Sequence, residues 1–184
     1  MYSVAGDDIQ GARLAAQHLV RLGHMRIGFV GSSFWPLSSS RRAQGYAIEL
    51  ALAGVEPEPD WHVIPDGIDD FECGRQALRA LLNSGISAAF CYNDRMAIGA
   101  LLEARACGIR VPEDISIVGF DDINSGWYVI PGLTTVHQAR FRMGRQAMQM
   151  VLDLLDGEAV SDVVFPCRLI ERGSTAPLVA ASNS

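Results

Sequence analysis

The sequence predicts an α/β protein whose parallel sheet is flanked by helices on both faces. Short apolar runs alternate with amphipathic segments of helical period along the chain. The runs expected to form strands are continuously apolar, which is typical of parallel strands covered on both sides. With 184 residues, 49% of them hydrophobic, the chain is long enough to bury a core without a disulfide or a metal.

Helices are predicted where apolar residues recur every three to four positions between a capping residue and a glycine. The first follows Asp7 and ends at Gly23, and Asp70 is predicted to cap the third. The predicted helices share this pattern and span residues 7–22, 41–53, 70–84, 93–107 and 138–156.

Strands are predicted at short apolar runs that lie between glycine, proline or charged residues. These runs share their length and apolar character and lie at residues 26–31, 61–64, 88–92, 115–120 and 163–170. The serine-rich segment 32–40 and the segment 121–131 are expected to be loops. Residues 176–184 are expected to be a loose tail.

Composition excludes several classes of protein. All fifteen basic residues are arginine, so mechanisms that need a lysine, such as a phosphate-binding P-loop or a Schiff base, are excluded. The net charge of −6 argues against DNA binding by this chain alone. No export signal and no apolar run of membrane-spanning length is present, so we expect a cytoplasmic protein that does not contact a membrane.

Polar and aromatic side chains gather where the predicted strands end, which is where open α/β sheets bind ligands. The residues at these strand ends are Ser32, Trp35, Arg42, Asp66, Asp69, Asp70, Asn93, Asp94, Asp121 and Asp122. Asn93, Asp70 and Asp94 each also suit a helix N-cap. Carboxylates and an amide accept hydrogen bonds, an arginine donates them, and aromatic rings cover C–H surfaces, so the set suits a neutral polyol.

Enzymatic interpretations are weaker. Asp121 and Asp122 could hold Mg²⁺, but such sites normally include a lysine, and adjacent residues of an extended segment point to opposite sides. No nucleophile elbow or HExxH motif is present, and neither the four histidines nor the four cysteines have metal-ligand spacing. We therefore expect no catalytic residue, no metal and no cofactor.

Several motifs occur in an order and spacing that is specific in combination. They are Asp8 and Gly11, residues 16–19 (AQHL), 22–24 (LGH), 42–45 (RAQG), Asn93–Asp94, 111–116 (VPEDIS), 118–122 (VGFDD), 131–136 (PGLTTV), Gly144 and 172–175 (RGST). Over roughly residues 4–175 the sequence resembles the lactose/galactose-repressor family of bacterial transcription regulators.

The resemblance implies a core like that of periplasmic sugar-binding proteins, in which a ligand lies between two α/β subdomains. Residues 26–133 and 159–175 are then expected to form the C-terminal effector-binding subdomain. Residues 1–25 and 134–158 are expected to be remnants of an N-terminal subdomain that is otherwise largely missing. The family's helix-turn-helix headpiece would also lie outside this sequence.

Three of the family's effector contacts fall on residues already placed at the predicted strand ends. Arg42, Asn93 and Asp121 match its motifs, and Gln138, just after the LTTV segment, is a weaker match. The family often has an aromatic residue near the second strand end, where Ile68 or Phe71 stands nearby. Together with Trp35, which follows the first predicted strand, the expected ligand-binding residues are Arg42, Asn93, Asp121, Gln138, Trp35 and Phe71.

The resemblance thus implies the effector-sensing domain of a repressor that binds a sugar or a similar small polar metabolite. It also implies a homodimer, and contact with operator DNA only through the headpiece. The alternatives are a sugar-binding protein of a transport system and, less favoured, a sugar-modifying or phosphoryl-transfer enzyme. A helix-turn-helix upstream of Met1 would indicate the regulator, and a signal peptide the transport protein.

The helix predicted at 138–156 carries a large apolar face. Phe141, Met148, Val151 and Leu155 lie on it at helical spacing. With most of the N-terminal subdomain missing, this face is expected to pack on the helix at 7–22 or on a second copy of the chain, because burying each large side chain is worth roughly 1.5–3 kcal/mol.

Overall fold

The computed structural model describes residues 2–179. Strands and helices alternate through most of the chain, as the sequence predicts. In order they are β1 (Val4–Gly6), α1 (Asp8–Arg21), β2 (Ile27–Val30), α2 (Pro36–Leu52), the 3₁₀ turn η1 (Pro59–Trp61), β3 (His62–Val63), α3 (Asp70–Leu82), β4 (Ala88–Cys91), α4 (Asp94–Ala106), β5 (Ser116–Asp121), α5 (Ser125–Tyr128), β6 (Thr134–His137), α6 (Arg140–Leu155), β7 (Val163–Phe165) and β8 (Arg168–Ile170).

The larger of the two sheets has six strands in the order β3-β2-β4-β5-β6-β8. Neighbouring strands from β3 to β6 pair in parallel, and only β8 pairs with its neighbour β6 in the antiparallel direction. Because the parallel strands all end at the same edge, the residues that follow β2, β4, β5 and β6 meet there.

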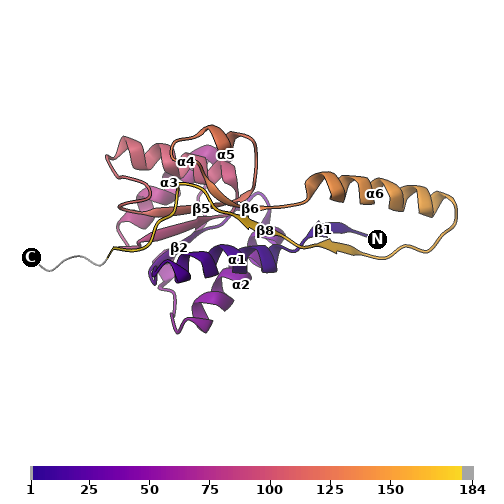
Figure 1. The fold of residues 1–184 in the computed structure, drawn as a ribbon, viewed down its shortest axis with the longest axis horizontal. Helices are drawn as coiled ribbons and strands as arrows, with labels where there is room; N and C mark the ends of the chain where they lie inside the picture. The colour runs from indigo at the N-terminus through magenta and orange to yellow at the C-terminus, as the bar shows by residue number, and fades with distance from the viewer. Residues whose placement is uncertain (1, 180–184) are drawn as a thin grey trace, which may run out of the picture.

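Helices cover both faces of this sheet (Figure 1), as the predicted fold class requires. Alternate residues of each strand point to opposite faces. On one face Phe29, Phe90 and Phe120 pack against α1 and α2, and on the other Val30 and Cys91 pack against α3 and α4. All five side chains are almost completely buried, so the parallel strands are fixed by two apolar layers.

A smaller substructure extends from this body at the right of Figure 1. It consists of α6 and of the two-stranded parallel sheet formed by β1 and β7, and we call it the arm. Residues Ser3 and Asp162 close the end of this sheet, where the Asp162 carboxylate accepts from the Ser3 amide at 2.7 Å.

Several strand predictions were wrong in detail because they depended on local sequence alone. β1 and β6 were not predicted, and the strand expected at 163–170 is divided at Pro166 into β7 and β8, which belong to different sheets. The strand expected at 61–64 has two residues, and the loop expected at 32–40 already contains the first turn of α2, which begins at Pro36.

The first helix does not lie with the arm. Residues 1–25 were assigned with 134–158 to a remnant of the other subdomain, yet Ala12, Ala16 and Leu19 of α1 are fully buried against the six-stranded sheet. β6, from the second segment, is also a strand of this sheet. The division between the arm and the body therefore falls near residue 7, after β6 and between β7 and β8, since α1 contributes to the main core.

The tail expected at 176–184 is held at its start. The Ala176 amide donates to Ser116 Oγ at 3.1 Å, and the Leu178 amide donates to the carbonyl of Leu22 at 2.8 Å. Residues 180–184 lie outside the described part of the chain.

The expected packing of α6 on α1 is not observed. Phe141, Met148, Val151 and Leu155 are 86%, 60%, 49% and 78% exposed. α6 contacts β1 and projects away from the body, so α1 and α6 do not share a face (Figure 1). Among residues 2–179, the apolar face of α6 thus remains without a partner.

Candidate functional site

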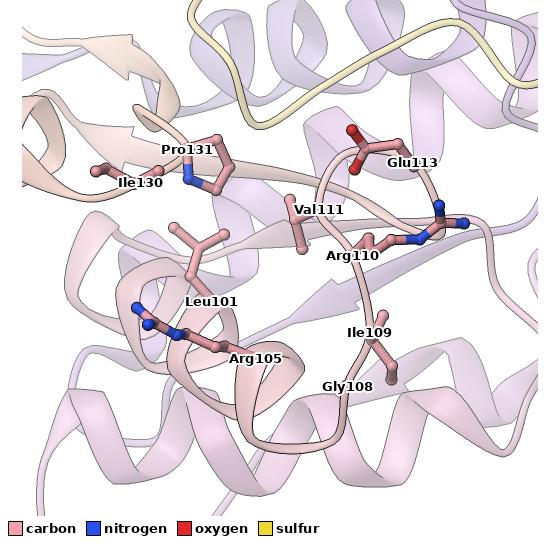
Figure 2. A pocket seen from close by; sticks show the side chains of 9 residues that line it. All are labelled: Leu101, Arg105, Gly108, Ile109, Arg110, Val111, Glu113, Ile130 and Pro131. Atoms are coloured by element: carbon pink, nitrogen blue, oxygen red, sulfur yellow. The ribbon is translucent and has the colours of Figure 1, made fainter.

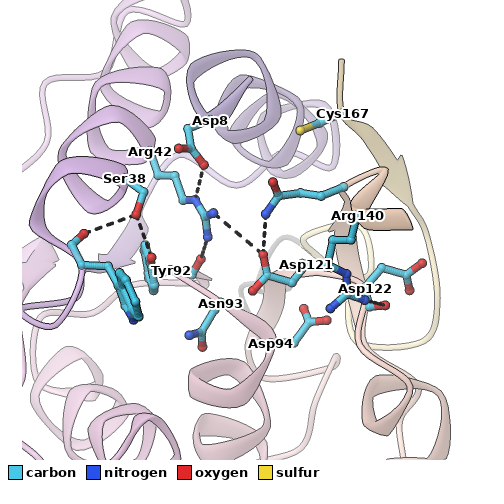
Figure 3. A network of polar contacts seen from close by, with 12 residues as sticks. Asp8, Ser38, Arg42, Tyr92, Asn93, Asp94, Asp121, Asp122, Arg140 and Cys167 are labelled. Carbon is cyan, nitrogen blue, oxygen red and sulfur yellow. Dashed lines mark hydrogen bonds and ion pairs between the residues drawn. The ribbon is translucent and has the colours of Figure 1, made fainter. Parts of the chain in front are cut away.

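Arg42 is held in a fixed position at the carboxyl end of the sheet. It lies on α2, and the residue is only 4% exposed. Its Nε donates to Asp8 Oδ1 at 2.8 Å, and its Nη1 donates to the carbonyl of Tyr92 (Figure 3). The guanidinium carbon lies 3.6 Å from the ring centre of Phe120 and 4.5 Å from that of Tyr92. These contacts orient one edge of the guanidinium toward the strand ends.

Asp121, the last residue of β5, lies beside this guanidinium. Its Oδ1 is 3.8 Å from Arg42 Nη2 and accepts a hydrogen bond from Gln138 Nε2 at 2.7 Å. Burial raises the pKa of Asp121, while Arg42 and Gln138 oppose that rise. The structure therefore brings Arg42, Asp121 and Gln138 into one contacting group, which we call the strand-end group.

Asn93 adjoins this group because it follows Tyr92 at the end of β4. Asn93 Oδ1 accepts from the Met96 amide at 2.9 Å and caps α4, and Nδ2 donates to Asp70 Oδ2 at 2.9 Å. The prediction that Asp70 caps α3 was wrong, because the neighbouring Asp69 accepts from the Glu72 amide. The Asp70 carboxylate is thereby available to Asn93.

The two expected aromatic contacts lie farther out. Trp35 immediately precedes α2 and is 63% exposed. Ser38 lies 2.8 Å from the Tyr92 hydroxyl and also donates to the carbonyl of Trp35, and a hollow of about 300 Å³ is lined by Asp8, Trp35 and Ser38 among others. Phe71 is 38% exposed at the start of α3, next to Asp70.

Asp122 does not join Asp121 in one site. Its Oδ1 accepts from Arg172 Nη2 at 2.6 Å, and its Oδ2 lies 2.9 Å from His137 Nδ1. Burial opposes ionisation of Asp122, but Arg172 and His137 outweigh it and hold the pKa below its usual range. The carboxylates of Asp121 and Asp122 therefore have separate partners, and the two side chains do not form one group.

Sequence reasoning underestimated Tyr92 and Asp94. Tyr92 contributes its carbonyl and its ring to Arg42 and its hydroxyl to Ser38, and its position just after β4 was the available signal. Asp94 was interpreted as a helix cap, a role that Asn93 fills. Asp94 is instead completely buried beside the turn that carries Asp121 and Asp122 (Figure 3).

A larger hollow, of about 650 Å³, lies elsewhere on the body. It is lined by the end of α4, by residues 108–113 and by Ile130 and Pro131 (Figure 2). These segments lead into the first residues of β5 and β6, so the hollow adjoins the opposite edge of the sheet from the strand-end group. None of the expected ligand-binding residues lines it.

The described residues 2–179 lack two features, a membrane-spanning helix and a cluster of metal ligands. None of their helices is long and apolar enough to cross a membrane. They contain no group of three or more histidine, cysteine or acidic side chains arranged to hold a metal ion. The strand-end group itself offers carboxylate acceptors beside guanidinium and amide donors, which is chemistry for binding hydroxyl groups.

A parallel sheet with a polar group at the carboxyl ends of its strands defines the class of small-molecule-binding α/β domains. The chain matches the periplasmic binding protein-like domain over residues 16–175, and it belongs to this family.

Its relatives include transcription regulators. The HTH-type transcriptional repressor CytR of Escherichia coli (strain K12) is 40% identical over 177 residues, which cover 94% of this chain and 51% of the relative. This chain spans about half the length of the curated relatives that it matches.

Solved structures of regulators have the same fold. The transcriptional regulator CelR–cellobiose complex matches with a TM-score of 0.87 and 33% identity, over 94% of this chain and 54% of that one. A LacI family transcriptional regulator from Enterococcus faecium with bound ribose matches with a TM-score of 0.88 and 30% identity, over 97% of this chain and 66% of that one.

Proposed function

We propose that this chain is the effector-sensing part of a bacterial transcriptional repressor and that it binds a sugar or a similar small polar metabolite without catalysis. The observation that carries the proposal is the contact of Arg42, Asp121 and Gln138 at the carboxyl ends of the parallel strands. Asp121 accepts from ligand hydroxyls, and Arg42 and Gln138 donate to ligand oxygens.

The chemistry of the relatives supports the same ligand class. CelR is described in complex with cellobiose, and the Enterococcus faecium regulator with ribose. Both ligands are neutral polyols. They match a site that combines carboxylate acceptors with a guanidinium donor whose charge is already neutralised by Asp8. The transport-protein alternative gains no support from these relatives, which are regulators.

The partners follow from the same proposal. We propose that this chain works within a cytoplasmic homodimer that contacts operator DNA through a helix-turn-helix headpiece. Its HTH-type relatives support the DNA contact. This chain carries a net charge of −6, so we do not expect it to contact the DNA phosphates itself. Asn93, Trp35 and Phe71 complete the proposed ligand surface around the strand-end group.

A thermal-shift screen of the complete protein tests the proposal. The screen contains neutral monosaccharides, disaccharides and nucleosides, with ribose and cellobiose among them. At least one compound is expected to raise Tm, and Asp121→Ala is expected to abolish that rise because it removes the central acceptor. Asp114→Ala is the matched control, since Asp114 pairs with Arg110 near the opposite edge of the sheet. A screen without any shift, or an unchanged shift in Asp121→Ala, contradicts the proposal.

A further inference from the structure

Asp121, the last residue of β5, and Asp122, which follows it, have unusual backbone geometry. Asp121 has a φ of 109° and Asp122 a φ of 52°, and both values lie in the region that favours glycine. Non-glycine residues persist there only where their surroundings hold them. The placement of the Asp121 carboxylate beside Arg42 and Gln138 depends on this turn, so some neighbouring group must fix it.

Asp94 is the buried side chain that contacts this turn from behind. Its Oδ2 accepts from the Ile123 amide at 2.8 Å, and its Oδ1 accepts from the Thr135 hydroxyl. The same Thr135 oxygen lies 3.4 Å from the Asp122 amide, which donates to it. Asp94 and Thr135 together therefore bind the two consecutive amides that follow Asp121.

The sheet leaves space for this carboxylate at one position. Gly119 of β5 pairs with Thr135 of β6, and a Cβ on Gly119 would lie 2.3 Å from Asp94 Oδ1. The glycine in the middle of a buried strand is thereby explained, since any side chain there would displace Asp94. Arg172 and His137 hold the Asp122 side chain separately.

We propose that Asp94 is a positioning residue that holds the turn after β5, so that Asp121 faces Arg42 and Gln138. The inference depends on the proposed function only in taking Asp121 to be an effector contact. Asp94 itself is 0% exposed, so a ligand bound at the surface cannot reach its side chain. Its effect on effector binding is transmitted through the backbone of residues 121–123 and the strand β6.

NMR of the isotope-labelled chain tests this role without any effector. Two signals are followed: exchange of the Ile123 amide proton, and the side-chain amide shift of Gln138, which reports its hydrogen bond to Asp121. Asp94→Ala is expected to raise Ile123 exchange by at least about tenfold and to move the Gln138 signal toward that of a free amide.

Asp94→Asn should preserve both signals, because the new amide can accept from Ile123 and donate to the Thr135 oxygen. Glu103→Ala is the matched control. Glu103 is a buried carboxylate on the same helix, but it binds Arg75 and Arg79. It should leave both signals unchanged.

Thr135→Val replaces the hydroxyl by a methyl group of similar size. It serves as the second test if Asp94→Ala does not fold, and it should shift both signals in the same direction as Asp94→Ala. An unchanged Gln138 signal in the folded variants overturns the inference. A negative sugar screen would overturn the proposed function but would leave this result standing.

Discussion

Helices α3 and α4 cross with their backbones in contact. Replacing a helical glycine by alanine normally stabilises the helix, but at this crossing we expect it to destabilise the chain. A Cβ placed on Gly74 of α3 would lie 1.9 Å from the carbonyl oxygen of Met96. A Cβ on Gly99 of α4 would lie 2.0 Å from that of Phe71. Side-chain carbons do not approach backbone closer than 3.0 Å, so either alanine must push the helices apart by about 1 Å.

The magnitude follows from two opposing effects. Replacing a helical glycine by alanine is worth about 1 kcal/mol to the helix when nothing obstructs the methyl group. Overpacking a rigid interface costs about 1–3 kcal/mol, and backbone atoms cannot yield as a flexible side chain can. We expect Gly74→Ala and Gly99→Ala each to lose about 2 kcal/mol, a fall in Tm of about 4–8 °C for a chain of this size.

Urea unfolding and calorimetry of the chain measure these changes. The double variant should lose less than the sum of the single losses, because one separation of the helices relieves both clashes. Gly144→Ala on α6 is the control, since nothing lies within 4 Å of its added Cβ, and it should lose no stability. Stability equal to the unmodified chain in Gly99→Ala would refute the close crossing.

Three further predictions concern charge. Burial raises the pKa of Asp94 to about 7, so the folded state binds this proton more tightly than the unfolded state does, and stability falls as pH rises from about 4 to 7. Asp94→Asn should remove that fall, which is worth a few kcal/mol, when urea unfolding at pH 5 is compared with urea unfolding at pH 8. Arg79 and Arg75 lower the pKa of Glu103 to about 2, so Glu103→Gln should lose stability at pH 7 but little at pH 2, where the carboxyl group is protonated in the unfolded state and about half protonated in the folded one. With its net charge of −6, the chain alone should show no nanomolar operator binding in a gel shift.

The parts of the fold that the sequence predicted are those whose pattern is local. β2, β4 and β5 are continuous apolar runs, so period and composition suffice to identify them. β6 begins with two threonines and takes strand form because it pairs with β5 and β8. β1 has only three residues and depends on β7. Such strands are stabilised by partners distant in sequence, which no local pattern reveals.

The sequence also could not predict which elements pack against one another. The apolar stripe of α1 predicted that one face is buried but not which sheet covers it, and α1 packs in the main core. In the site, Arg42 and Asp121 could be placed together because both follow parallel strands. The contribution of Asp94 could not be predicted in this way. Asn93 and Asp94 suit the same helix cap, and only the packed structure shows which of the two fills it.

The location of a bound effector tests the central claim most directly. A crystal structure of the complete protein with whichever compound of the sugar panel stabilises it most should show one ligand hydroxyl about 2.5–3.0 Å from a carboxylate oxygen of Asp121. Arg42 and Gln138 should lie within hydrogen-bond distance of the same ligand. A ligand seated in the hollow between the end of α4 and Pro131, with Asp121 free, would contradict the account.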